Sequence, residues 1–293
     1  MNDFLSKLEN FLFDILGLIL PGAIFLLILM SPLLVVDLSQ VPAKIIDNSI
    51  ILSAQKTTLD ILKNYWASYP KSVLTIAAIL AYLIGHTVKV FSILKYGFLV
   101  ALFDRSLNRL FVSAFNSIKN RMFSEKARKS QAYAWFKDVF KPIKIVIGDI
   151  FIFKPAYHSK DDEVLMQDCT NILTASTNIV YPKDDYLLGK ISGVIANQEG
   201  FRTLGTFFLA KYNLYRSLSL IFLFAIFYCI YFFKLVHMYI KPSSCEVSII
   251  LPMIAAVLWY TFHVKYKRYW TLYGNERTIS LFYFLNKKKI NEA

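Results

Sequence analysis

The sequence predicts a mainly α-helical protein with four membrane-spanning helices and a mostly helical cytosolic head. First, the 293 residues are 56% hydrophobic and only 18% charged, with a mean hydropathy of +0.46, whereas soluble domains carry about 25% charged residues. Second, the hydrophobic residues gather in four long runs. Third, the net charge of +13 is unevenly distributed, because residues 105–216 hold seventeen Lys/Arg against ten Asp/Glu. These observations divide the chain into residues 1–104, the basic head 105–216, a transmembrane hairpin at 217–264 and a basic tail at 265–293.

The first region begins with an amphipathic pattern and continues into an uncharged run. Residues 1–14 fit either a surface helix or the first turns of a longer spanning helix. Residues 15–36 are 22 residues without a charge, enough to cross about 30 Å of hydrocarbon at 1.5 Å per residue. Pro21 cannot donate a hydrogen bond to the Gly17 carbonyl, so a kink or break is expected. Gly17, Pro21 and Gly22 are therefore candidates for a gating or packing point, and a tolerated kink is the alternative.

The next two segments are an external region and the second span. Residues 37–71 predict a helix over 47–66, with Tyr65, Trp66 and Tyr69 at the membrane interface. The second span is placed at 72–91, because Lys89 then lies near an end, where its ammonium group reaches water. His86 lies about one turn from the cytosolic edge. His86 and Lys89 are candidates for a pore lining or for the membrane interface.

Charge orients the chain. Spans three and four, at 217–233 (extending towards 237) and 247–264, are joined by the short segment 241–246 and so form an antiparallel hairpin. Segments 105–216 and 265–293 carry net charges of +7 and +5, whereas 37–71 carries +1 and 241–246 carries zero. Positive loops stay cytoplasmic. The sequence therefore predicts a multi-pass membrane protein with both termini cytoplasmic.

Within the head, the periodicity is mostly helical. Residues 105–141 have one apolar face and continue from the second span. Residues 143–153 are β-branched and aromatic, which predicts a strand or extended segment. Acidic residues open a predicted helix at 161–177. Residues 184–216 are expected to form one long helix entering the third span, with Gly189 and Gly193 as a site of close helix approach.

No stretch carries a catalytic motif. Phosphate-binding loops, zinc-protease helices, nucleophile elbows and dinucleotide fingerprints are all absent from the sequence. The nearest approach to a metal cluster is His158 with Asp161, Asp162 and Glu163, which solvated loop charges and a helix N-terminal turn explain better. The prediction is a protein that is not an enzyme and has no catalytic residues, no metal site and no cofactor.

A basic and aromatic patch in the head predicts binding. Residues 105–144 hold ten Lys/Arg against two acidic residues, with aromatic residues between them. Cations beside stackable rings suit a nucleotide or single-stranded oligonucleotide; attraction to anionic lipid, together with control of topology, is the alternative. The candidate binding residues are Arg121, Lys126, Arg128, Lys129, Tyr133, Trp135, Lys137, Lys141 and Lys144.

Three features resemble a known class of proteins: the Pro21-Gly22 span, the basic head, and the sequence Asn-Leu-Tyr-Arg at 213–216 leading into the third span. Over the whole chain, this layout is similar to multi-pass membrane effectors of bacterial anti-phage defence, the Hailong-type channel subunits. The resemblance implies a channel of the bacterial inner (cytoplasmic) membrane, controlled by oligonucleotides from a partner nucleotidyltransferase. The leading hypothesis is thus a homo-oligomeric channel or membrane-disrupting effector in the lipid bilayer. A non-catalytic scaffold whose head docks a partner protein is the second hypothesis, and a lipid-handling enzyme or transporter is the third.

Overall fold

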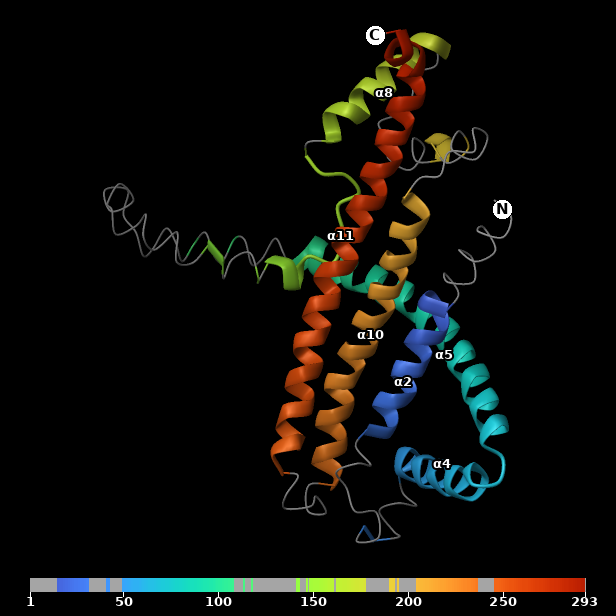
Figure 1. Ribbon diagram of the computed structural model, residues 1–293. Coiled ribbons are helices and arrows are strands. Elements are labelled where there is room, and N and C mark those ends of the chain that lie inside the picture. Colours follow the sequence, from blue (N-terminus) through green and yellow to red (C-terminus); the bar gives the residue numbers. More distant parts are fainter. Residues whose placement is uncertain are drawn as a thin grey trace. The chain divides into compact units, whose positions relative to one another are not determined.

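The computed structural model shows a helical chain. It describes residues 15–31, 41–42, 49–107, 113, 117, 141–142, 146, 148–160, 162–177, 190–192, 194, 204–236 and 245–292. Nearly all of these residues are helical and none forms a strand, which confirms the prediction of a mainly α chain. The helices are η1 (Ile15–Ile19), α2 (Leu20–Met30), α4 (Ile50–Trp66), α5 (Pro70–Leu99), η3 (Val100–Leu107), α8 (Asp162–Thr177), α10 (Gly205–Val236) and α11 (Cys245–Glu292) (Figure 1).

Three of the described helices are long and apolar enough to cross a membrane. They cover Pro70–Asp104, Gly205–Lys234 and Ile249–Asn286. A fourth apolar stretch, Gly17–Met30, is shorter than the roughly 20 residues that a spanning helix needs. Residues 32–36 of the predicted first span lie outside the described residues, so the fourth span stays a prediction.

The helices extend beyond the predicted spans. α5 runs from Pro70 into η3, and α11 continues to Glu292, through most of the predicted basic tail. Backbone hydrogen bonding propagates wherever the side chains allow it, so a helix does not end where its hydrophobic residues end. α10 begins at Gly205 after a turn at Leu204, which contradicts a single helix over 184–216.

The predicted strand at 143–153 is wrong where the structure describes it. Residues 148–151 are helical, and the N–H of Ile152 donates to the Gly148 carbonyl at 2.9 Å. A short apolar run looks alike in a buried strand and in a helix, so periodicity alone could not decide. The predicted helix at 161–177 corresponds to α8, with Asp162 and Glu163 in its first turn.

Two compact units make up the chain. Unit 1 comprises Met1–Ser92 and Asn213–His263, and unit 2 comprises Ile93–Tyr212 and Val264–Ala293. α5, α10 and α11 each supply residues to both units.

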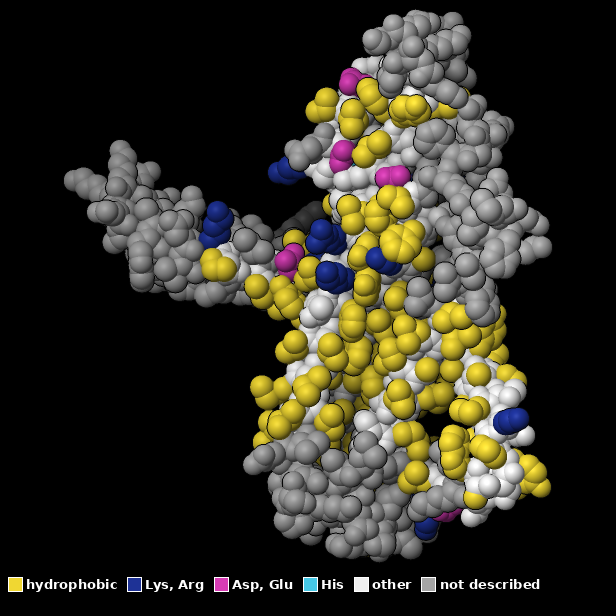
Figure 2. Space-filling view, in the orientation of Figure 1, with side chains coloured by type: hydrophobic (Ala, Val, Ile, Leu, Met, Phe, Trp, Pro, Cys, Tyr) yellow, Lys and Arg dark blue, Asp and Glu magenta, His cyan; other side chains and the backbone are white. Residues whose placement is uncertain are grey.

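The core of unit 1 forms where α2, α5 and α10 meet. Its buried residues are Val88 on α5 and Leu214, Leu218 and Ile221 on α10. Half of the most apolar stretch of α10 is buried, against 17% for the corresponding stretches of α5 and α11. α10 is therefore the most enclosed of the three spanning candidates, while α5 and α11 keep most of their apolar surface exposed. Figure 2 shows hydrophobic side chains covering much of the apolar helices on the face in view.

The closest packing in unit 1 joins α2 to α5. A Cβ added to Gly22 would lie 1.7 Å from the Ala81 carbonyl oxygen, and one added to Gly85 would lie 1.9 Å from the Leu18 carbonyl oxygen. Both glycines are therefore required for backbone contact between the helices, as in small-xxx-small packing of membrane helices. The predicted close approach at Gly189 and Gly193 lies outside the described residues.

Unit 2 has a smaller core between α8 and the C-terminal part of α11. Cys169 and Leu173 of α8 pack with Leu281 of α11, and all three side chains are buried. Met166, Ile191, Phe282 and Leu285 pack around them. The amphipathic helix α8 thus gains its partner from a part of the chain more than 100 residues away.

Candidate functional site

A segment that we call the strap, residues 148–160, follows one face of α11 in unit 2. Its backbone carbonyls accept hydrogen bonds from side chains of α11: Tyr266 Oη donates to the Phe153 oxygen, and Thr271 Oγ1 donates to the Ala156 oxygen at 2.7 Å. Further along, the Ser159 N–H donates to Asn275 Oδ1 at 3.1 Å. Thr271 and Asn275 are four residues apart and therefore lie on the same face of α11, whereas Tyr266 lies about 140° around the helix from Thr271 at 100° per residue.

Residue types explain why α11 can hold this segment. From Ile152 to Ser159 the strap is not helical, and Pro155 cannot donate a hydrogen bond, so several of its backbone groups need partners outside the segment. Gly274 lets the strap approach closely, because a Cβ there would lie 1.8 Å from the Tyr157 carbonyl oxygen. Thr278 Oγ1 lies 3.3 Å from His158 Nδ1.

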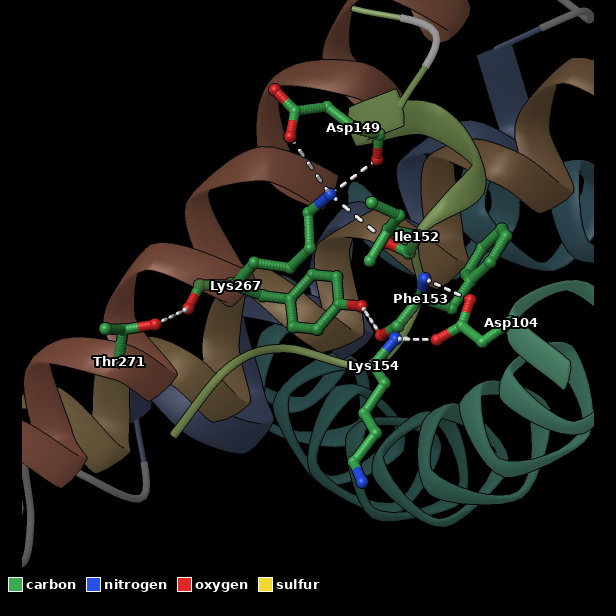
Figure 3. Close-up of polar contacts among 8 residues, drawn as sticks. Asp104, Asp149, Ile152, Phe153, Lys154, Lys267 and Thr271 are labelled. Atoms are coloured by element: carbon green, nitrogen blue, oxygen red, sulfur yellow. Dashed lines mark hydrogen bonds and ion pairs between the residues drawn. The ribbon is translucent and has the colours of Figure 1, made fainter. Parts of the chain in front are cut away.

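Lys267 and Asp104 hold the start of the strap from two sides (Figure 3). Lys267 Nζ donates to the carbonyls of Asp149 and Ile152 and lies 3.7 Å from the Asp149 carboxylate. On the other side, the Asp104 carboxylate accepts the N–H groups of Phe153 at 2.9 Å and Lys154 at 2.6 Å. Hydrogen bonds to charged groups contribute about 1.5–3 kcal/mol each, more than neutral ones. Asp104 and Lys267 are therefore the strongest polar anchors of the strap.

An aromatic cluster surrounds the same anchors. The ring of Tyr266, which is almost fully buried, lies 4.7 Å from the ring of Tyr96. The ring of Trp270 lies 4.7 Å from that of Tyr212 and 5.1 Å from that of Tyr157. Such pairs contribute about 0.5–1.5 kcal/mol beyond the area they bury. Ring contacts therefore join the strap to α11 through Tyr157 and Trp270 and to α5 through Phe153 and Tyr96, and α10 joins the cluster through α11.

Two features of this part of the chain bear on its possible chemistry. In the part of the chain that the structure describes, no group of three or more His, Cys, Asp or Glu side chains is placed to hold a metal ion. Burial raises the pKa of the Cys169 thiol to about 11, with a smaller contribution from Asp168, so this thiol is poorly suited to act as a nucleophile at neutral pH. The strap and α11 are in direct contact through these hydrogen bonds and rings.

A second polar site lies in unit 1, around Arg216. Its side chain is only 8% exposed, within a helix apolar enough to span a membrane. Nε donates to Ser92 Oγ at 3.2 Å, and Nη2 donates to Asn213 Oδ1 at 3.1 Å. Ser92 Oγ in turn donates to the Lys89 carbonyl at 2.7 Å. Burying a charged side chain in an apolar helix is costly unless it is hydrogen-bonded, and here a polar chain links Arg216 to α5.

Few of the sequence-predicted site residues fall where the structure can place them. Of the binding patch, only Lys141 is described, and it is exposed in a helical stretch. The other eight candidates, Arg121, Lys126, Arg128, Lys129, Tyr133, Trp135, Lys137 and Lys144, lie outside the described residues. The binding patch therefore remains a prediction.

The other predicted residues lie on η1, α2 and α5. Pro21 and Gly22 are buried in the first turn of α2, and Gly17 is buried in the π-helical turn before it. His86 is exposed, with its ring edge-on to Tyr82 at 4.6 Å, and Lys89 is half-buried. The close contact at Gly22 supports the packing interpretation of this region.

Sequence reasoning missed the anchors of the strap. Asp104 did carry a signal, because it is the only acidic residue between Asp60 and Glu125 and ends a long apolar run. Lys267 and Tyr266 carried none, since they lie among many basic and aromatic residues. Arg216 was noted for its position before the third span but not as a buried group.

No protein-family model, curated protein or solved structure matches this chain.

Proposed function

We propose that this protein is a homo-oligomeric membrane channel or membrane-disrupting effector, controlled through the basic segment 105–216. The strap carries the proposal: it follows the basic residues 105–144 in the chain and is fastened to α11, a candidate spanning helix. A ligand that changes the conformation of the basic residues displaces the strap. The strap is hydrogen-bonded to Tyr266 and Lys267 of α11, so its displacement changes the position of this helix. The three long apolar helices supply the membrane component.

The ligand in this proposal is a nucleotide or a single-stranded oligonucleotide bound by the patch between Arg121 and Lys144, made by a partner nucleotidyltransferase. Support comes from the cationic and aromatic composition of that segment. Binding of short single-stranded oligonucleotides to the full-length protein should weaken with salt, with a slope of about −0.7 per neutralised phosphate. Binding that survives Lys/Arg→Glu changes across 128–144 would exclude the patch.

Ion flux is the deciding measurement. We expect full-length protein in liposomes to release a trapped dye or conduct ions, and a panel of short oligonucleotides to change the rate. Lys267→Met, which removes the cation that holds the strap, should uncouple flux from the ligand while leaving binding intact. Protein that never conducts under any of these conditions would remove the channel proposal. If it instead co-purified with a partner protein, it would be a non-catalytic docking scaffold.

The proposed topology has four spans, both termini in the cytoplasm and the bacterial inner membrane as its location. Native Cys169 cannot report on it, since this side chain is fully buried. Exposed positions serve better: Lys160→Cys for the head and Asp60→Cys for the external segment, both in a Cys245→Ser background. An impermeant maleimide applied to whole cells should label position 60 and spare position 160. The reverse pattern would invert the topology.

A further inference from the structure

Helix α4 has three distinct faces. Its docked face carries Leu52 and Gln55, which are 0% and 5% exposed. About 140° around the helix at 100° per residue, an apolar face carries Ile50 and Ile61, which are 87% and 52% exposed, together with the exposed Tyr65. The third face carries the exposed charged residues Lys56 and Asp60. The exposed apolar face formed by Ile50, Ile61 and Tyr65 has no stabilising role for a helix that is surrounded by water.

The docked face is fastened within unit 1 by a small polar cluster. Gln55 Nε2 donates to both the Leu29 carbonyl and Tyr228 Oη, and Tyr228 Oη donates to the same carbonyl at 2.8 Å. Gln55 therefore ties α4 to the end of α2 and to α10. In Figure 1, α4 lies across the direction of α2 rather than along it. Because α10 runs in nearly the same direction as α2 in this view, α4 would lie in the plane of a membrane that α10 crosses.

The chain also limits how far α4 can lie from a bilayer. α4 ends at Trp66, and α5, the next candidate span, begins at Pro70. Only three residues separate the two helices, so the end of α4 must lie where α5 enters the membrane. Three aromatic side chains there, Tyr65, Trp66 and Tyr69, are all more than half exposed. Tyr and Trp are the residues that favour the headgroup region.

We propose that α4 is an in-plane membrane helix whose exposed apolar face, Ile50, Ile61 and Tyr65, enters the boundary between lipid headgroups and acyl chains. Lys56 and Asp60 then face water, and Gln55 holds the helix against α2 and α10. Apolar residues on one side and charges on the other are the pattern of interfacial helices. The ligand of this surface is the lipid interface itself. The inference rests on the membrane placement in the proposed function.

Depth-dependent fluorescence quenching tests the proposal on the full-length protein. Ile61→Cys and Asp60→Cys, each in a Cys245→Ser background, carry an environment-sensitive fluorophore in phosphatidylcholine–phosphatidylglycerol vesicles. Because the two positions are adjacent in the sequence and about 100° apart around the helix, they differ mainly in the face of α4 on which they lie. We expect doxyl groups near the headgroups to quench position 61 at least threefold more than position 60. Equal quenching would overturn the in-plane helix.

A third position separates this proposal from the proposed function. Ile79 on α5 is 55% exposed, and a fluorophore on Ile79→Cys should be quenched by doxyl groups deep in the acyl chains. If position 79 is quenched and position 61 is not, α4 is not a membrane helix although the protein spans the membrane. If neither is quenched, the membrane placement itself fails. Efficient disulfide cross-linking between Ile61→Cys copies, without lipid quenching, would assign the face to a second copy and overturn the lipid proposal.

Discussion

The contacts between the helices of unit 1 differ in kind from the contacts that hold the strap in unit 2. In unit 1, the helices pack through apolar side chains and through backbone contact at Gly22 and Gly85. In unit 2, a non-helical segment is held by side-chain hydrogen bonds from α11, by the Asp104 carboxylate and by aromatic rings. The difference follows from the backbone: a helix satisfies its own N–H and C=O groups, whereas an irregular segment needs partners from elsewhere.

The two units also differ in what their buried polar residues do. Gln55 and Arg216 in unit 1 each join helices that already pack by shape. Asp104 and Lys267 in unit 2 hold a segment that has little helical structure of its own. Removing shape complementarity should therefore damage unit 1 most, and removing polar anchors should release the strap of unit 2 without disturbing unit 1.

The largest effect is expected for Gly85→Leu in unit 1. The new side chain overlaps the Leu18 backbone, which cannot move aside as a side chain can. The free energy of unfolding should therefore fall by more than the usual cost of overpacking, which is about 1–3 kcal/mol. Gly97→Leu on the same helix is the control, because nothing lies within 4 Å of a Cβ there. The midpoints of thermal unfolding in detergent, monitored by size-exclusion chromatography, compare the two variants. Similar midpoints would show that α2 and α5 do not pack as described.

Gly274→Leu should have a large effect confined to unit 2. It overlaps the Tyr157 carbonyl, so we expect the strap to lift and the nearby core to loosen. Cys169 reports this: buried and with a raised pKa, it should react slowly with N-ethylmaleimide in the parent protein and roughly tenfold faster in the variant. Gly148→Leu, with open space around its Cβ, is the control. Cys229 in unit 1 should keep its slow rate; faster labelling of both thiols would mean that the units do not respond separately.

A smaller change is expected when a single anchor is removed. Asp104→Ala leaves the N–H groups of Phe153 and Lys154 without their carboxylate, at a cost of about 1–3 kcal/mol. Asp104→Asn keeps one acceptor oxygen and should cost less. Hydrogen exchange at residues 153–154 should accelerate in the order wild type, Asn, Ala. If exchange is unchanged, these amides do not depend on Asp104.

The smallest effect is expected for Tyr228→Phe in unit 1. The variant loses one hydroxyl, while Gln55 Nε2 keeps the Leu29 carbonyl as a partner, so the cost should be about 0.5–1.5 kcal/mol. Combined with Gln55→Leu, it should show coupling, because the two side chains share one network. The readout is the same thermal midpoint in detergent. Strictly additive shifts would indicate that Gln55 and Tyr228 act independently.

Local patterns could identify the helices but not all of their ends. The α8 helix was predicted within one residue because acidic residues mark its start, and α4 was predicted because its periodicity is regular. The prediction of a strand at 143–153 was wrong, because a strand needs a partner strand and none is found among the described residues. The start of α10 at Gly205 was not predicted, because a glycine weakens a helix but does not by itself show at which residue the helix begins or ends.

The amino-acid sequence by itself determined that this is a helical protein with long apolar segments, since hydrophobicity and periodicity are properties of the chain read in order. Only the tertiary structure decided which residues hold the chain together. Asp104 lies about 50 residues from the backbone amides it binds, and Tyr266 lies 113 residues from the carbonyl it binds. Gly22 and Gly85 matter because two helices touch there. Contacts between distant segments depend on how the helices pack in space, and no local pattern records that packing.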